Sequence, residues 1–151
     1  MSTKKLGPVF ADVVKDIEAY HKTQPKRANL ICGGIFYDDP NSLVDENKMR
    51  LCAGVLVRAS NQVIQGHFSN LGYKVAELPR VTSAYACHPM RLKKLGIQFV
   101  VAAIRTYPKL FHFLEENAEK YKRMLNGQKT MFIELYRDGS DKRIDFFCPL
   151  S

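Results

Sequence analysis

The sequence predicts an α+β fold built from two similar halves, and two observations support this prediction. Residues 35–39 (IFYDD) are similar to residues 134–138 (ELYRD), which lie 99 positions further along the chain. Each segment ends a predicted strand, follows an amphipathic helix and precedes a second strand. We therefore expect one domain over residues 1–151, with a first module at about 1–58, a connector at about 59–79 and a second module at about 80–150.

The first module begins with a predicted helix over residues 9–22. Its apolar residues recur at helical spacing, Pro8 suits the first helical position, and Pro25 ends the helix. Strands follow at residues 29–37 and 50–58, because the sequence Asp-Asp-Pro-Asn between them favours a turn.

The same local patterns predict the helices and strands of the connector and the second module. A short helix is predicted from Val63 to Leu71, with Gly72 after its end, and strands are predicted at residues 73–77 and 80–88. The longest apolar stripe at helical spacing covers residues 95–118, and Pro108 within it predicts a kink or a break. Strands at residues 130–137 and 143–148 form the closing hairpin.

The composition fits one globular domain, since the 151 residues are 46% hydrophobic and 25% charged. No apolar run approaches the roughly 18 residues of a membrane-spanning helix, and the first residues do not resemble a signal peptide. The four cysteines are scattered, which favours buried free thiols in a reducing compartment. We therefore expect a soluble protein in the cytoplasm or the nucleus.

The net charge is +8, but the basic residues are dispersed and form no long run. A solvated basic surface is therefore expected, and nucleic acid is not expected as a partner. The four histidines lack the spacing of a metal site, and no phosphate-binding loop or serine-hydrolase motif occurs. We expect no metal and no cofactor.

The closing hairpin carries the most informative ionisable residue. Strand alternation divides its first strand into two faces, with Phe132, Glu134 and Tyr136 on one and Met131, Ile133 and Leu135 on the other. We expect the second face to pack against the helices. The Glu134 face then lies either in solvent or in a cleft, where a carboxylate between aromatic rings would attract a flat cation or act as a base.

Six short motifs carry a family resemblance by their order and spacing: residues 34–40 (GIFYDDP), 52–54 (CAG), 72–75 (GYKV), 105–108 (RTYP), 134–136 (ELY) and 146–150 (FFCPL). Together they resemble the GyrI-like (gyrase-inhibitor-like) domain, and most closely its animal branch, that of a reticulophagy receptor. The resemblance covers about residues 7–150. It implies two strand–helix–strand–strand modules that form a curved antiparallel sheet, with two main helices and a central cleft.

The resemblance also implies a function, because the family cleft binds planar, amphiphilic or cationic small molecules. Some members are effector domains of transcription factors, and others are detoxifying hydrolases that open cyclopropane-bearing electrophiles. The pocket glutamate of the family corresponds to Glu134, which in a hydrolase would orient or deprotonate water. Its aromatic pocket positions correspond to Tyr37, Tyr85, Phe99 and Tyr136, and Phe132 shares the face of Glu134. The alternative is a non-catalytic adaptor domain related to the receptor.

The beginning of the chain leads to a further expectation. A strand usually needs about five or six residues, and few precede the helix that starts near Pro8. We expect either that residues 2–6 form a short strand or that a second copy completes this sheet edge as a homodimer.

Overall fold

The computed structural model describes residues 6–24, 28–38, 50–78, 80–90, 95–117, 119–120, 131–137 and 142–150, and only the backbone of residues 6–7 and 95–100. The predicted α+β class is confirmed. The elements in chain order are α1 (Leu6–Thr23), β1 (Ile31–Phe36), β2 (Leu51–Leu56), α2 (Gln62–Asn70), β3 (Ser83–Pro89), α3 (Leu95–Glu116), β4 (Phe132–Arg137) and β5 (Arg143–Pro149).

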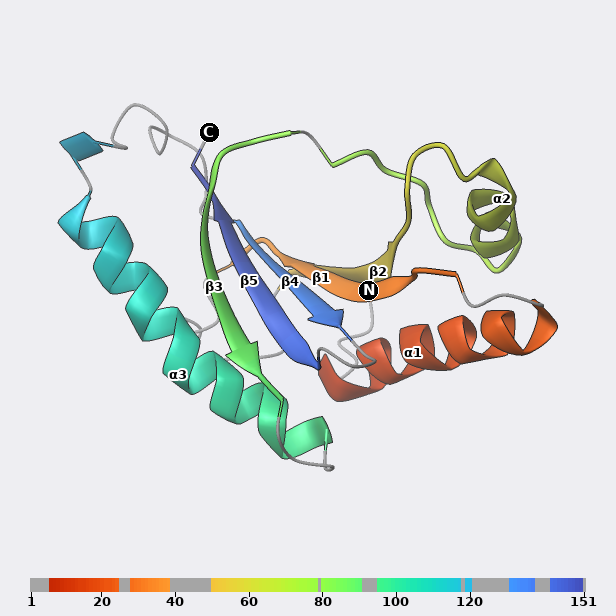
Figure 1. Cartoon of the computed structure of the whole chain (residues 1–151), viewed down its shortest axis with the longest axis horizontal. Helices are drawn as coiled ribbons and strands as arrows, with labels where there is room; N and C mark the ends of the chain where they lie inside the picture. Colours follow the sequence, from red (N-terminus) through yellow and green to blue (C-terminus); the bar gives the residue numbers. More distant parts are fainter. Residues whose placement is uncertain are drawn as a thin grey trace.

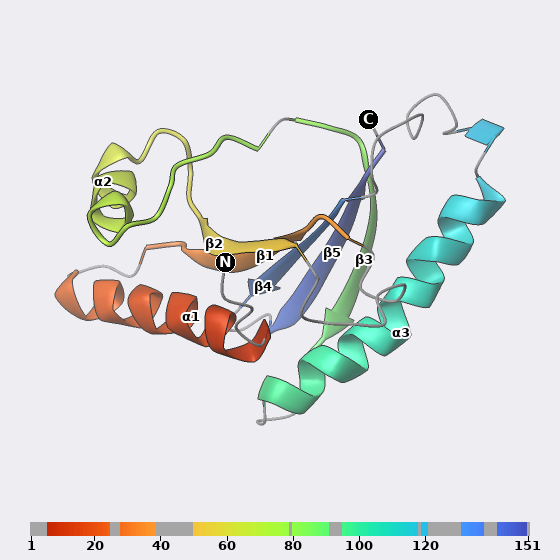
Figure 2. The same ribbon diagram turned by 180° about the vertical axis from the view of Figure 1, so that it is seen from behind.

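The strands form one open antiparallel sheet in the order β2-β1-β4-β5-β3. The hairpins β1–β2 and β4–β5 meet through their first strands, so β1 and β4 lie side by side at the centre. The sheet is curved, and α1 and α3 lie on the same face of it (Figures 1 and 2). α1 covers β1 and β2, whereas α3 covers β3 and β5.

The core lies between the sheet and the helices in two clusters. The first gathers residues from α3 with β3, β4 and β5, including Tyr107, Phe132 and Phe146. The second gathers residues from α1, α2 and β1: Val13, Ile17, Tyr20, Cys32, Ile64 and Phe68. Phe10 and Tyr136 pack against both clusters and so join the two halves.

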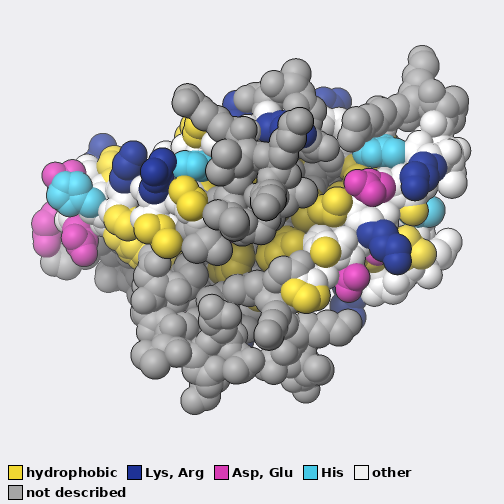
Figure 3. All heavy atoms as spheres, turned by 90° about the horizontal axis from the view of Figure 1, so that it is seen from below, with side chains coloured by type: hydrophobic (Ala, Val, Ile, Leu, Met, Phe, Trp, Pro, Cys, Tyr) yellow, Lys and Arg dark blue, Asp and Glu magenta, His cyan; other side chains and the backbone are white. Residues whose placement is uncertain are grey.

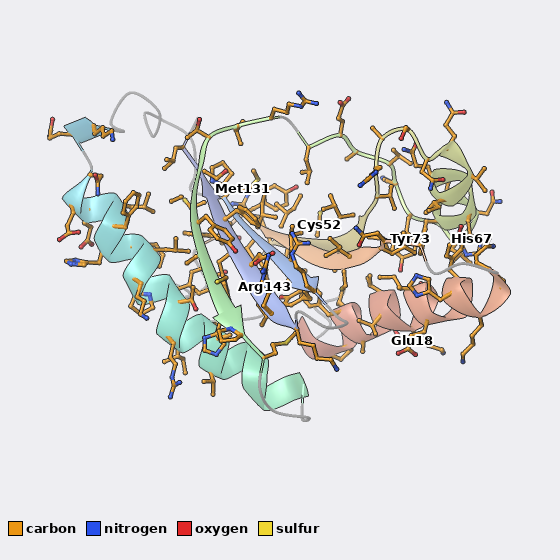
Figure 4. All side chains as sticks on the ribbon, viewed as in Figure 1. Glu18, Cys52, His67, Tyr73, Met131 and Arg143 are labelled. Carbon is orange, nitrogen blue, oxygen red and sulfur yellow. The ribbon has the colours of Figure 1, made fainter. Side chains whose placement is uncertain are left out.

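The connector contains the predicted short helix, α2. The side chain of Asn61 accepts a hydrogen bond of 3.2 Å from the Ile64 N–H, which caps the first turn. Gly72 follows the helix with φ +92°, the left-handed conformation that glycine adopts readily. The Tyr73 hydroxyl donates to Asp16 at 2.7 Å and ties the connector to α1. Tyr73 and His67 lie where α2 approaches α1 (Figure 4).

One predicted strand is wrong, and one of the two outcomes predicted at Pro108 does not occur. Residues 73–77 form no strand, and Val75 is 64% exposed, because no neighbouring strand pairs with this segment. α3 continues through Pro108 without a break, and the kink stays a prediction. Pro108 and Ile104 are both exposed, so solvent can reach the carbonyl that loses its hydrogen bond to a proline nitrogen.

The alignment of the two modules at an offset of 99 residues is also wrong, because it matches residues that face opposite sides of the sheet. Gly34 pairs with Glu134 and Ile35 pairs with Ile133 in the β1–β4 ladder, so Ile35 and Glu134 face opposite sides of the sheet. A shift of one residue reverses every side chain of a strand. Tyr37, which the same alignment matches with Tyr136, therefore also faces the opposite side of the sheet from Tyr136.

The predicted terminal strand falls on residues 2–6, of which 2–5 lie outside the described residues. Leu6 belongs to α1 and not to a strand. Among the described strands, none pairs with the outer side of β2, and the homodimer stays a prediction. None of the described helices has the length and apolar composition needed to cross a membrane.

Candidate functional site

Glu134 lies in the central strand β4 and faces the helices, not solvent. Tyr107 of α3 contacts the same face of the sheet, with ring centroids 5.2 Å from Phe132 and 5.4 Å from Phe146. On the other side, Phe10 of α1 meets Tyr136 edge-on at 5.0 Å. The expectation that the Met131, Ile133 and Leu135 face packs against the helices is therefore wrong.

The carboxyl group of Glu134 is held by two tyrosine hydroxyls. Tyr107 donates to Oε1 and Tyr136 donates to Oε2, so each oxygen has one donor. The residue is only 8% exposed. Because Tyr107 comes from α3 and Tyr136 from β4, the carboxyl joins the helix to the centre of the sheet.

Burial disfavours ionisation in this cluster. It raises the pKa of Glu134 above its usual value, and the two tyrosine hydroxyls offset this only in part. Burial and the neighbouring Glu134 carboxylate also raise the pKa of Tyr136 well above its usual value. Tyr136 therefore remains a proton donor, and burial favours the neutral form of Glu134.

Glu134 has no cationic partner among the described residues, and the groups that bond to its carboxyl are two uncharged hydroxyls. This distinguishes it from most buried carboxylates, which are paired with a cation. A negative charge at this position would be stabilised by any cation that reached it.

Asp145 shows what a paired carboxylate looks like in the same sheet. Arg137 and Arg143 both donate to it from Nε, the latter at 2.8 Å, and the Tyr85 hydroxyl donates at 2.9 Å. Burial opposes the ionisation of Asp145, but these donors outweigh it and lower its pKa. Arg143 is labelled in Figure 4. Because two arginines already neutralise the Asp145 carboxylate, Asp145 has a structural role.

The structure brings together three of the six predicted site residues. Phe132, Glu134 and Tyr136 share the helix-facing side, and Phe132 is 1% exposed beneath Tyr107. Tyr37 and Tyr85 lie on the opposite face, the first beside Cys52 and the second beside Asp145. Phe99 belongs to α3, but its side chain lies outside the described residues.

Tyr107 and Phe10 are site residues that the sequence patterns did not predict. Both lie in predicted helices, and Tyr107 also belongs to the RTYP motif at residues 105–108. A signal was available for Tyr107, because a tyrosine hydroxyl inside an apolar stripe needs a buried hydrogen-bond acceptor. Glu134 and Asp145 are the acidic residues in the two strands of the closing hairpin that could supply one.

Among the described residues, the cysteines and the other possible metal ligands form no second candidate site. The described residues contain no group of three or more side chains that could hold a metal ion. All four cysteines are free, and burial raises the pKa of Cys32 to about 12 and of Cys148 to about 11. Cys52 and Cys87 are exposed, contrary to expectation, because they lie on the sheet face opposite α1 and α3.

Hydrophobic side chains are visible on part of the helix side of the molecule. In Figure 3 hydrophobic side chains gather near the centre of this face, and most of the visible charged side chains lie toward its two ends. Ligand pockets are lined mostly by apolar side chains with a few polar groups.

Comparison of the chain with protein-family models, with curated proteins and with solved structures found no match.

Proposed function

We propose that this domain binds planar, amphiphilic or cationic small molecules over Glu134, on the side of the sheet that carries α1 and α3. The observation that supports the proposal is a buried carboxyl with two hydroxyl donors and no cation among the described residues. A ligand cation would supply the missing charge, in a surrounding where burial makes that interaction strong.

The aromatic rings around Glu134 suit a flat ligand. Tyr107 and Tyr136 bond to its carboxyl, and Phe10 packs edge-on against Tyr136. Aromatic faces attract cations and provide stacking area for planar groups. The GyrI-like resemblance of the sequence points to the same ligand class and to the same glutamate.

Hydrolysis of a cyclopropane-bearing electrophile is the catalytic extension of this proposal. Water would attack the strained ring, forming a C–O bond while a ring C–C bond breaks. Glu134 would take a proton from the water and return it to the carbon that receives the electron pair. The raised pKa of Glu134 brings its proton affinity closer to that required of a general base near neutral pH.

The binding test uses a matched pair of probes, the planar cation N-methylquinolinium and the neutral 1-methylnaphthalene. Calorimetry and thermal unfolding should show binding of the cation to the wild-type protein and to Glu77→Gln, which removes an exposed carboxylate. Glu134→Gln, which keeps the size of the side chain, should weaken binding by about tenfold or more. Equal binding of both probes, or equal binding by Glu134→Gln, would contradict the proposal.

The catalytic test is separate. Turnover of a cyclopropane-bearing alkylator should fall by about a hundredfold or more in Glu134→Gln. Cation binding without any turnover would contradict the hydrolase proposal and support a domain that only binds its ligand. Absence of both would favour the alternative, an adaptor domain.

A further inference from the structure

β3 is an outer strand of the sheet, and the hydrogen bonds at its two ends show which backbone groups point outward. The Met90 N–H donates to the Lys142 carbonyl at 2.9 Å, and the Leu150 N–H donates to the Thr82 carbonyl at 2.8 Å. In an antiparallel ladder the residues that bond to the neighbouring strand alternate. Even-numbered residues of β3 therefore bond to β5, and the N–H and C=O groups of Ser83, Tyr85 and Cys87 point away from the sheet.

These outward groups are available for pairing. Among the described residues, no backbone hydrogen bond is made to them from outside the sheet. Pro89 ends the strand, and its outward position has no N–H to donate. The free edge is therefore short and spans Ser83 to Cys87.

A groove of about 280 Å³ runs along this edge, between β3 and α3. It is lined by Ser83, Ala84, Tyr85, Ala86, Lys109, Leu110 and Phe113. Ala84 and Ala86 leave space on the helix side of the strand, where longer side chains would fill it. Leu110 and Phe113 form the apolar wall, and Lys109 is the charged residue among the lining residues.

We propose that the edge of β3 binds an extended acidic peptide segment of a partner protein, which adds a strand to the sheet. Addition of a peptide strand to an open sheet edge is a common mode of recognition. The peptide residues opposite Ala84 and Ala86 point into the groove and take apolar side chains. The peptide residue opposite Tyr85 forms hydrogen bonds with the backbone of Tyr85. An acidic side chain at a further groove-facing position of the peptide reaches Lys109.

Charge decides between a partner peptide and a second copy of this chain. Each copy has a net charge of +8, and pairing of two β3 edges would bring two copies of Lys109 toward one interface. Like charges at an interface disfavour that pairing. An acidic peptide supplies the complementary charge, and it involves neither Glu134 nor its two tyrosines.

The test uses the capped eight-residue peptide Glu-Thr-Val-Thr-Val-Thr-Glu-Thr, whose valines and glutamates share the face that meets the groove, with two controls. One control carries N-methyl groups on alternate amides, and the other replaces glutamate with lysine. NMR titration of the wild-type chain should show the parent peptide shifting β3 amides. N-methylation should weaken binding by about tenfold or more, since it removes the hydrogen bonds of one edge.

Two protein variants test the same site from the other side. Cys87→Pro removes one outward N–H and no bond to β5, and Cys87→Ala is its matched control. We expect Cys87→Pro and Lys109→Glu to bind the parent peptide about fivefold or more weakly, with Cys87→Ala unchanged.

Several outcomes would overturn the proposal. Equal binding of the parent and N-methylated peptides would show that no strand is added. No binding at millimolar peptide would show that the edge is not a recognition site. Dimerisation of the chain alone that Cys87→Pro abolishes would show that the occupant is a second copy.

Discussion

Glu134 and Asp145 lie on neighbouring strands and face opposite sides of the sheet. Asp145 pairs with Leu135, the residue next to Glu134 in β4, so the two carboxyl groups are separated by the sheet itself. Both residues are buried, with exposed fractions of 8% for Glu134 and 1% for Asp145. Asp145 has two arginines, whereas Glu134 has two hydroxyls, and their pKa values shift in opposite directions.

Glu134→Gln should stabilise the protein near neutral pH. Burial raises the pKa of Glu134 above its unfolded value of 4.5, so the folded state binds the proton more tightly. The stability that this proton contributes is present below about pH 4.5 and is lost as the pH rises through the raised pKa. Thermal unfolding between about pH 4 and pH 8 should therefore show an advantage for Glu134→Gln that grows with pH.

Asp145 provides the opposite pH dependence in the same experiment. Its pKa is lowered, so the stability that it contributes is present above its unfolded value of 3.8 and is lost as the pH falls through the lowered pKa. That loss lies at more acidic pH than the Glu134 effect. A difference between Glu134→Gln and wild type that is constant across the pH range would contradict the raised pKa of Glu134.

Tyr107→Phe should destabilise the protein by about 1–3 kcal/mol, because it leaves a buried carboxyl oxygen without its donor. The phenylalanine ring can keep the packing against Phe132 and Phe146. Tyr73→Phe is the matched control, since its acceptor Asp16 is only half-buried and water can replace the lost hydroxyl. Urea unfolding should show the larger loss for Tyr107→Phe, and equal losses would contradict the assignment.

Gly34→Ala should destabilise the protein by about 1–3 kcal/mol through overpacking. A Cβ atom at Gly34 would lie 2.6 Å from Cζ of Phe10, on the strand position that pairs with Glu134.

Gly54→Ala is the matched strand control, because its Cβ atom would meet nothing within 4 Å. We expect no loss, or a gain of about 0.5–1 kcal/mol from the more restricted unfolded chain. If both variants have the same unfolding midpoint in urea, the contact between α1 and the sheet is not as close as described.

The fold class and most elements could be predicted because they depend on local patterns. Helical spacing of apolar residues located α1, α2 and α3, and turn residues separated the strands of each hairpin. Residues 73–77 were the exception, since an apolar stretch becomes a strand only where a neighbouring strand can pair with it.

The orientation of β4 could not be predicted from its own residues. Ile133 and Leu135 are as apolar as Phe132 and Tyr136, so alternation gives two faces without showing which one meets the helices. The residue that shows which face meets the helices is Tyr107, which lies 27 residues before Glu134 and donates a hydrogen bond to its carboxyl group. The site therefore depends on a contact between distant parts of the chain.

The β1–β4 ladder at the centre of the sheet has a consequence for folding. β1 and β2 can pair as soon as both are synthesised, but β1 must wait for β4, which lies about 100 residues later. At about 5–20 residues per second this delay lasts about 5–20 s on the ribosome. During that time the inner edge of β1 is open to another nascent chain. A slow step that joins two preformed hairpins, and exchange of hairpins between chains when that step fails, follow from this order of strands.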